Sequence, residues 1–419
     1  MAPRGQPFAG SKYHRAISCG ALFPAMLFAA GAHAQVEDSD PAIANLPRPG
    51  YEPRTIRVGS TILSPELALL ARYDDNVFAT PTDRRGSAIV DLRTQVALRR
   101  TTPGLDIRAA VYGAGRRYTR YARENATTFG GRVGAAKTLG ERSSLNVRTS
   151  FDRLYERRSD PEAIVDPSRR PSLIDRSEFA ADVRTGGSRF DLSANATVSK
   201  FDYRRSIEDD RDLSSYQASV RGGVRFRGGS SIYLQPFVNH RDARLKVDRG
   251  GVNRDSTTMG VLAGVAFDLA DRLSGDLGVG AFRADPADPR LGSYDGLAYS
   301  GRISWRPRIR TAVLFQAFRG DVATIRSGAL GRVDTRLSLA LDQEAHHDLI
   351  VRSFVALRNV HYRGSIDRDQ RYLTVGAGLR YLLNRHVSLL LDADWTRRGA
   401  DQPNERLHRH QTTTTLLFL

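Results

Sequence analysis

The sequence predicts an all-β protein, a transmembrane antiparallel up-and-down β-barrel of about eighteen strands. The first support is an alternation of apolar and polar side chains, which residues 89–99 show clearly. Val90 and Leu92 fall on one face of this segment, and Asp91 and Arg93 fall on the other. A repeat of two residues is the repeat of a β-strand. Strands with one apolar and one charged face suit a barrel in lipid with a wet lumen.

The second support is the number and length of these segments, which follow one another from residue 66 to residue 419 and are bounded by turn residues. Sandwich strands are shorter, and a propeller would need a shared repeat near 40 residues, which the chain lacks. The predicted strands are 66–75, 88–100, 105–121, 126–138, 143–156, 177–185, 189–203, 213–227, 231–246, 256–269, 273–283, 293–306, 309–323, 330–343, 348–362, 368–382, 386–398 and 407–419.

The third support is that short and long connections alternate, as they do in outer-membrane barrels. The longest connection, 157–175, is expected to be an exposed surface loop rather than a constriction folded into the lumen. Pro236 falls inside a predicted strand. Because a closed barrel has no free edge, a bulge or a strand boundary is expected there.

The first 34 residues have the pattern of a signal peptide. Arg4, Lys12 and Arg15 precede an apolar core, and Ala32-His33-Ala34 forms a small-x-small cleavage site. The expected divisions are therefore a signal peptide at 1–34, a Pro-rich periplasmic leader at 35–64 and the barrel at 65–419. The single cysteine, Cys19, lies in the signal, so the mature chain has no disulfide.

The chain is strongly basic, with a formal charge of +17. Loss of the three basic residues of the signal leaves +14 on the mature chain. Such a balance indicates polyanionic partners, and export argues against nucleic acid. The expected partners are outer-membrane lipid and lipopolysaccharide, the barrel-assembly machinery, and an anionic polysaccharide or the proteins of its export complex. The expected location is the outer membrane of a Gram-negative bacterium.

One motif is more specific than the rest of the chain. It is Tyr73, Asp74, Asp75, Asn76, Val77 and Phe78. Together with Arg48-Pro49-Gly50-Tyr51-Glu52-Pro53 and Ile56-Arg57-Val58-Gly59, it resembles the putative beta-barrel porin 2 family over nearly the whole mature chain. The resemblance implies an outer-membrane barrel associated with exopolysaccharide or capsule production, and it supplies no catalytic residues.

The alternation also assigns residues to the two faces of the wall. Apolar residues such as Val90, Leu92, Val96, Leu339 and Val375 are expected to face lipid. Arginine outnumbers acid among the residues expected to line the lumen. These pore-lining candidates are Arg93, Arg99, Arg108, Arg132, Arg148, Arg184, Arg221, Arg225, Arg332, Arg336, Arg352, Arg380, Asp91, Asp334, Asp392 and Asp394.

These assignments favour a passive conduit that prefers anions, because rings of arginine attract anions and a low-dielectric wall focuses their field. For any single arginine, a structural ion pair with a neighbouring strand is the competing interpretation. No enzyme activity and no cofactor are expected. Two alternatives stay open: a non-transporting scaffold that docks a polysaccharide-export complex, and a barrel hydrolase using His240, His361, His408 or His410 as its base.

Two acidic segments could hold a divalent cation through carboxylate oxygens. They are Asp74-Asp75-Asn76 and Glu208-Asp209-Asp210-Arg211-Asp212. The first is better explained by a turn that closes the first strand, because Asp and Asn favour turns. The second is better explained by a solvated loop. Neither is predicted to be a metal site.

Overall fold

The computed structural model describes residues 43, 46–53, 55–163, 166–226, 229–269, 272–324, 329–364 and 368–419. The predicted signal peptide at 1–34 lies outside these residues, as do residues 35–42, 44–45 and 54 of the predicted leader. Among the described residues, no helix has the length and apolar character needed to cross a bilayer.

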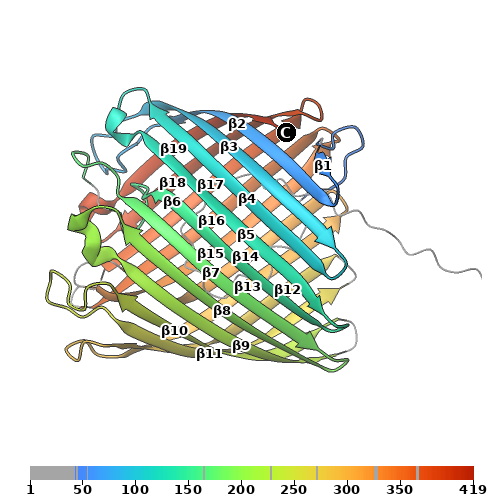
Figure 1. Ribbon diagram of the computed structural model, residues 1–419. Helices are drawn as coiled ribbons and strands as arrows, with labels where there is room; N and C mark the ends of the chain where they lie inside the picture. The colour runs from blue at the N-terminus through green and yellow to red at the C-terminus, as the bar shows by residue number, and fades with distance from the viewer. Residues whose placement is uncertain are drawn as a thin grey trace, which may run out of the picture.

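The described part of the structure is mostly strand (Figure 1). Each of the eighteen predicted strands corresponds to one long strand, with ends that differ by a few residues. The strands are β1 (Ile56–Val58), β2 (Thr61–Asp74), β3 (Ser87–Thr102), β4 (Leu105–Tyr118), β5 (Ala126–Leu139), β6 (Ser143–Tyr155), β7 (Leu173–Gly186), β8 (Phe190–Tyr203), β9 (Leu213–Arg225), β10 (Ser231–Ala243), β11 (Ser256–Leu269), β12 (Leu273–Pro286), β13 (Tyr294–Arg308), β14 (Thr311–Val322), β15 (Ala329–His346), β16 (Leu349–Gly364), β17 (Arg368–Leu382), β18 (Val387–Ala400) and β19 (Leu407–Phe418).

Strands β2 to β19 form one closed antiparallel sheet, so the predicted fold class is confirmed. Each strand pairs with the next in sequence, and β19 closes the ring by pairing with β2 from Gln411↔Asp74 to Phe418↔Leu67. The short β1 forms a hairpin with the first residues of β2 and adds no wall strand. Three short 3-10 helices, η2 (Ala122–Glu124), η3 (Ser206–Arg211) and η4 (Pro403–Glu405), lie in the longer connections.

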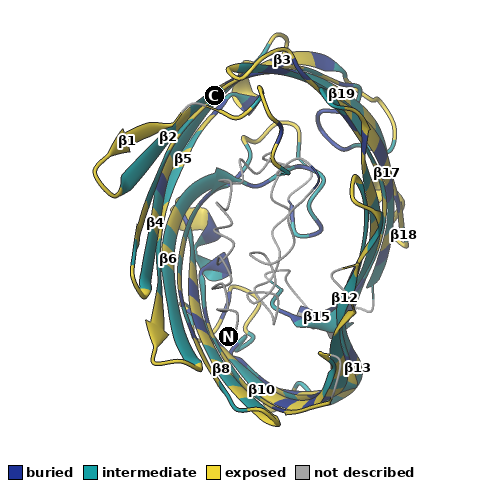
Figure 2. Ribbon diagram, turned by 90° about the vertical axis from the view of Figure 1, so that its right-hand side faces the viewer, coloured by how far each residue is buried: buried dark blue, intermediate teal, exposed yellow. Residues whose placement is uncertain are grey.

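The two faces of the wall follow the sequence alternation. In β3, Val90 and Leu92 are 47% and 49% exposed on the outside, whereas Asp91 between them is 2% exposed on the inside. Cross-strand partners share a face, so the register carries this assignment around the ring. The ring is oval in cross-section, and several connections lie inside its outline (Figure 2).

Pro65 and Pro236 are two of the prolines that lie in wall strands. Pro65 in β2 lies beyond the last residue pair with β19, where its missing N–H interrupts no closing ladder. Pro236 lies in an unbroken β10, so the predicted bulge or boundary is wrong. The ladder from β10 to β9 omits Gln235 and Pro236 and then resumes in the same register. The sheet therefore accommodates Pro236 by omitting local pairs instead of shifting register.

The motif Tyr73–Phe78 closes the seam between the first and last wall strands. The N–H of Asn76 donates to Oδ1 of Asp74 at 2.9 Å, which forms the predicted turn. Nδ2 of the fully buried Asn76 donates to the carbonyl oxygens of Thr80 at 2.8 Å and His408 at 3.0 Å. Asp75 accepts a bond from the N–H of His410 at 2.7 Å. Val77 and Phe78 are buried behind this turn, while Tyr73 faces outward. The motif thus continues the β2–β19 contact past the end of β2.

The segment before β1 lies against the short turn between β15 and β16. Arg48 forms a buried ion pair with Glu344 at 3.1 Å and donates to the carbonyl oxygen of Ile43 at 2.7 Å. The ring of Tyr51 packs edge-on against His347, with centroids 5.6 Å apart. These contacts fix the entry of the chain at the end of the barrel that carries the short turns.

Candidate functional site

The candidate site is the lumen, where buried carboxylates are shared by several arginines. Asp91 lies 2.8 Å from Arg116, 3.4 Å from Arg93 and 3.7 Å from Arg72. These residues belong to β3, β4 and β2, and the register brings them to one place on the inner face. One carboxylate therefore offsets only one of three positive charges.

The same arrangement recurs twice. Asp334, whose side chain has no solvent exposure, lies 2.5 Å from Arg336 and 2.6 Å from Arg358. Asp106 lies 2.7 Å from Arg99 and 3.3 Å from Arg108. The arginines are thus held by structural ion pairs, and in each cluster more than one arginine shares a single carboxylate.

Other predicted lumen arginines have single acidic partners on the wall. Arg221 binds Asp276 and Gln235, and its guanidinium stacks 3.7 Å above the ring of Tyr233. Further pairs are Arg184 with Asp182 at 3.1 Å, Arg225 with Asp191 at 3.3 Å and Arg352 with Asp342 at 3.2 Å. The five remaining pore-lining candidates also lie on the lumen face, because each pairs across strands with residues of that face. The pairs are Ala110↔Arg132, Gly134↔Arg148, Arg380↔Leu390, Gly378↔Asp392 and Gly376↔Asp394.

Sequence reasoning missed several lumen arginines. Arg72, Arg116 and Arg358 share carboxylates with the predicted residues, while Arg398 and Arg409 contact an inner loop. A signal existed for Arg116 and Arg358. Each lies an even number of residues from a predicted lumen residue of its own strand, Arg108 and Arg352 respectively. Extending the alternation to the strand ends would have found both.

Part of the connection between β6 and β7, described at 156–163 and 166–172, folds into the barrel and contacts its far side. Oε1 of Glu162 lies 2.6 Å from Nη1 of Arg332 in β15. The hydroxyl of Tyr362 in β16 donates to the carbonyl oxygen of Pro161 at 3.0 Å. Nη1 of Arg409 in β19 donates to Oγ of Ser159 at 3.2 Å. The expectation of an exposed surface loop is therefore wrong, because lumen arginines supply polar partners that the sequence pattern does not reveal.

The root of this β6–β7 loop is held by buried ion pairs on its own side. Arg211 of η3 lies 2.6 Å from Glu156 and donates to the carbonyl oxygen of Glu162 at 3.2 Å. Arg158 lies 2.8 Å from Glu124 of η2. Burial raises the pKa of Glu156 to about 7, an effect that Arg211 opposes. The loop is thus attached at both ends of its path across the lumen.

The acidic segment 208–212 is packed rather than fully solvated. Glu208 is buried and accepts a bond from Oγ of Ser172 at 2.7 Å, and Asp212 accepts one from the N–H of Tyr203 at 2.6 Å. The prediction of a solvated loop is wrong for these two residues. Across the described ranges, no group of three His, Cys, Asp or Glu side chains is placed to hold a metal ion.

A second element also turns inward. Strand β14 pairs with β13 only as far as Tyr299↔Arg319, and its end then leaves the wall together with the start of β15. There Asp321 lies 2.7 Å from Arg241 and accepts bonds from the hydroxyls of Tyr294 at 2.5 Å and Thr258 at 2.6 Å. The β14–β15 end is therefore fastened to the inner face of β10, β11 and β13.

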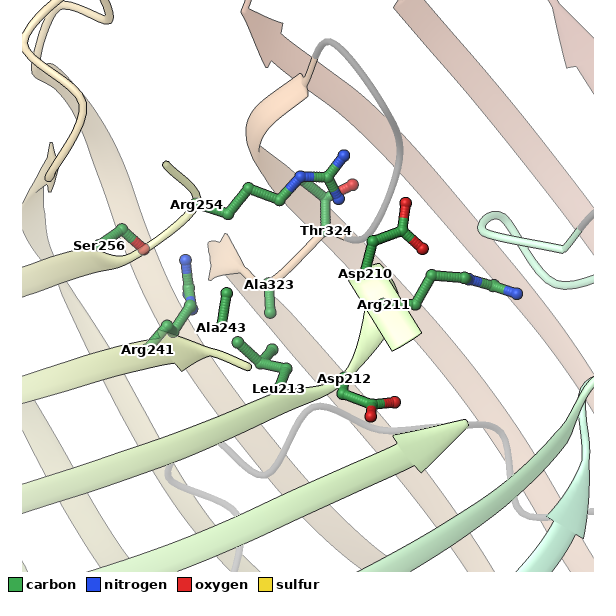
Figure 3. A pocket seen from close by; sticks show the side chains of 10 residues that line it. All are labelled: Asp210, Arg211, Asp212, Leu213, Arg241, Ala243, Arg254, Ser256, Ala323 and Thr324. Carbon is green, nitrogen blue, oxygen red and sulfur yellow. The ribbon is translucent and has the colours of Figure 1, made fainter. Parts of the chain in front are cut away.

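A small, partly open pocket lies beside this end (Figure 3). Arg211, Arg241 and Arg254 line it, together with Ala323 and Thr324, which follow β14. Each of the three arginines already has an acidic partner, respectively Glu156, Asp321 and Asp248. This pocket thus lies between the inward elements and the wall, and each of its arginines is paired with an acidic side chain.

The histidines considered as catalytic bases lie on the other side of the wall. His240, His361, His408 and His410 occupy strand positions of the outward parity. His361 lies 2.5 Å from Asp369, and His240 lies 3.0 Å from Thr257, both on the outer face. These bases do not face the lumen.

A closed barrel with an apolar outer face and a charged inner face has the architecture of an outer-membrane porin. Residues 48–417 match the family model described as "Putative beta-barrel porin 2". The chain therefore belongs to this family and is a porin-like outer-membrane β-barrel. The resemblance inferred from the motif is confirmed. The family takes its name from porins rather than from enzymes.

No curated protein matches the chain in sequence. Similar solved structures include OccK2 (OpdF) from Pseudomonas aeruginosa, with 12% identity, a TM-score of 0.47, and coverage of 87% of this chain and 99% of that chain. OccAB3 from Acinetobacter baumannii has 10% identity, a TM-score of 0.45, and coverage of 86% and 99%. The siderophore receptor PirA from Pseudomonas aeruginosa has 10% identity, a TM-score of 0.44, and coverage of 85% and 80%.

Proposed function

We propose that the chain is a passive conduit that prefers anions. The observation that carries this proposal is the sharing of Asp91, Asp106 and Asp334 by seven arginines in total. The excess charge lies inside a low-dielectric wall, which focuses its field into the lumen. Basic linings of this kind favour anions in pores. Diffusion through this lumen needs no covalent chemistry.

The proposed cargo is an acidic polysaccharide or its fragments, and the proposed cellular role is exopolysaccharide or capsule export or assembly. The motif resemblance supports the role, and the basic lumen supports an acidic cargo, because guanidinium groups bind carboxylates in a bidentate manner. We propose in addition that residues 1–34 direct export and are removed before Gln35. Sequencing the N-terminus of the chain in the outer-membrane fraction tests this cleavage.

The anion preference is tested with Arg93→Gln/Arg108→Gln in planar bilayers under a salt gradient. Arg93 lies farther from Asp91 than Arg116 does, and Arg108 lies farther from Asp106 than Arg99 does, so Arg116 still pairs with Asp91 and Arg99 still pairs with Asp106. We expect the chloride-to-potassium permeability ratio of the variant to fall by roughly twofold, because lumen charge is lost while Asp91 and Asp106 each keep an arginine partner. An unchanged ratio would show that these clusters do not determine the ion selectivity.

The matched control is Arg100→Gln/Lys137→Gln, which removes the same charge from the outer face near the short turns. Both side chains are exposed and point away from the lumen. We expect this control to keep the ratio of the unmodified chain. An equal fall in the control would show that total charge, rather than lumen charge, sets the ratio.

The cargo class is tested by adding galacturonate oligomers or neutral dextran oligomers of similar length to the open channel. We expect current interruptions with the acidic oligomers and far fewer with the neutral ones. Equal interruptions would contradict recognition of acidic sugars. A folded barrel that passes no current would support the docking scaffold instead.

A further inference from the structure

The outer surface carries a group of basic side chains near the end with the long connections. Arg371 in β17, Arg397 in β18 and His408 in β19 lie on three neighbouring strands of the ring (Figure 2). Arg397 is directly opposite His408, and Arg371 is directly opposite Gly399, two residues along from Arg397. Directly opposite and diagonal residues of one face are neighbours, so these three side chains form one surface, here named the rim cluster.

The rim cluster also includes Arg84 of the β2–β3 connection. Arg84 and Arg397 both lie within electrostatic range of His408. Arg84, Arg371 and Arg397 are exposed. Among the residues that the structure describes, none of these three arginines has an acidic side chain within ion-pair distance. The nearest carboxylate of the same face along β17, Asp369, is already paired with His361.

Two cations elsewhere on this rim have acidic partners. Arg153 in β6 lies 2.7 Å from Asp175 of β7, with both side chains on the outer face. Arg283 in β12 lies 3.1 Å from Asp285. Among the described residues, the arginines of the rim cluster differ from Arg153 and Arg283 in having no such partner. Adjacent like charges on a sheet face are destabilising unless an anion lies between them.

The position of the rim cluster relative to the bilayer indicates where that anion comes from. Below Arg371, the outward residues of β17 are Leu373, Val375, Ala377, Leu379 and Tyr381. The ten residue steps from Arg371 to Tyr381 span ~25 Å along the barrel axis for a strand tilted by ~40°, which is the height of an apolar belt. Arg371 thus lies at the outer boundary of this belt, at the depth of lipid headgroups.

We propose that the rim cluster binds the phosphate groups of the phosphorylated glycolipid that forms the outer leaflet, that is, the lipid A part of lipopolysaccharide. The guanidinium groups of Arg371 and Arg397 are accessible from outside and can bind phosphate oxygens in a bidentate manner. The apolar residues directly below them, including Val375 at 44% exposure, pack against the acyl chains. A soluble polyanion would match the charge but would leave this apolar surface uncovered. The site does not depend on the proposed conduit function.

The test measures binding of diphosphoryl lipid A to the purified full chain in detergent, by native mass spectrometry across a lipid titration. We expect one or more copies on the unmodified chain and roughly tenfold weaker binding to Arg371→Gln/Arg397→Gln, because two charge-assisted contacts are lost. Lipid A without its phosphates is expected to bind both chains weakly. Heat-modifiable migration on gels verifies that each variant is folded.

The matched control is again Arg100→Gln/Lys137→Gln, whose charges lie at the opposite rim. We expect it to bind lipid A like the unmodified chain. The proposal is overturned if Arg371→Gln/Arg397→Gln retains full binding, or if removal of the phosphates has no effect. Equal binding of phosphatidylglycerol would overturn the assignment to the outer-leaflet glycolipid. An equal loss in the control variant would show that only overall charge matters.

Discussion

Glu162 and Arg332 form an ion pair inside the lumen, with Oε1 and Nη1 2.6 Å apart, although 170 residues separate them in the chain. Glu162 belongs to the β6–β7 loop, and Arg332 belongs to the inward-turned start of β15. Both side chains are largely shielded from solvent. This pair joins the loop to the far side of the barrel, so the loop crosses the space through which a solute would pass.

Breaking this contact should widen the open path. We expect Glu162→Gln to raise the single-channel conductance and the frequency of current fluctuations, because the loop loses its ionic attachment to β15 while the wall ladders stay intact. Removal of one partner from a buried pair typically costs about 3–5 kcal/mol. The matched control is Asp166→Asn, which alters the exposed part of the same loop. A conductance identical to that of the unmodified chain would show that the loop does not limit the pore.

The attachment of the loop should weaken as pH rises. Burial raises the pKa of Glu156 to about 7 with the loop docked, above the ordinary value near 4.5 expected when the loop is released. Docking therefore binds a proton. The contribution of Glu156 to the stability of the docked loop is fully present below about pH 4.5. This contribution, on the order of 3 kcal/mol, is lost as pH rises through 7.

We therefore expect more current fluctuation at pH 8 than at pH 5.5. Glu156→Gln should remove most of this difference and resemble the low-pH state, because glutamine is neutral at both pH values. Single-channel recording at the two pH values measures the effect. A pH dependence that persists in Glu156→Gln would assign it to another group.

The strands and the loops differ in how far the sequence alone predicts them. All eighteen wall strands follow from the two-residue alternation, because burial on one face and lipid on the other act on every residue of a strand. The sharing of Asp91 by Arg72, Arg93 and Arg116 depends on the register of three strands, which alternation does not specify. The inward path of the β6–β7 loop depends on contacts such as Tyr362 with Pro161, which join distant segments. Contacts between distant segments produce no repeating pattern in the local sequence, so the alternation does not predict them.

The seam motif should contribute to the stability of the barrel rather than to conduction. We expect Asn76→Ala to lower the free energy of unfolding by about 2–4 kcal/mol, because it removes buried bonds to Thr80 and His408 and leaves backbone groups without partners. Urea titration followed by heat-modifiable migration measures the change. Gln402→Ala, at an exposed position of the β18–β19 connection, should have little effect. Equal stability of the two variants would contradict the role given to the motif.

One glycine of the wall lies under an aromatic ring and should not tolerate a side chain. A Cβ on Gly264 would lie 2.3 Å from the carbonyl oxygen of Leu277 and 2.4 Å from the ring of Tyr233. We expect Gly264→Ala to reduce the yield of folded barrel sharply, because two neighbouring strands would have to separate. Gly115→Ala is the control, since a Cβ there meets nothing within 4 Å. Similar folding yields for the two variants would contradict the tight packing of this wall.

The central claim is that the lumen carries an excess of positive charge that selects anions. The most direct test is the reversal potential of the unmodified chain in a planar bilayer with a tenfold gradient of potassium chloride. The account predicts a reversal potential whose sign reports that chloride is more permeant than potassium. A reversal potential of the opposite sign, reporting a preference for potassium, would contradict it.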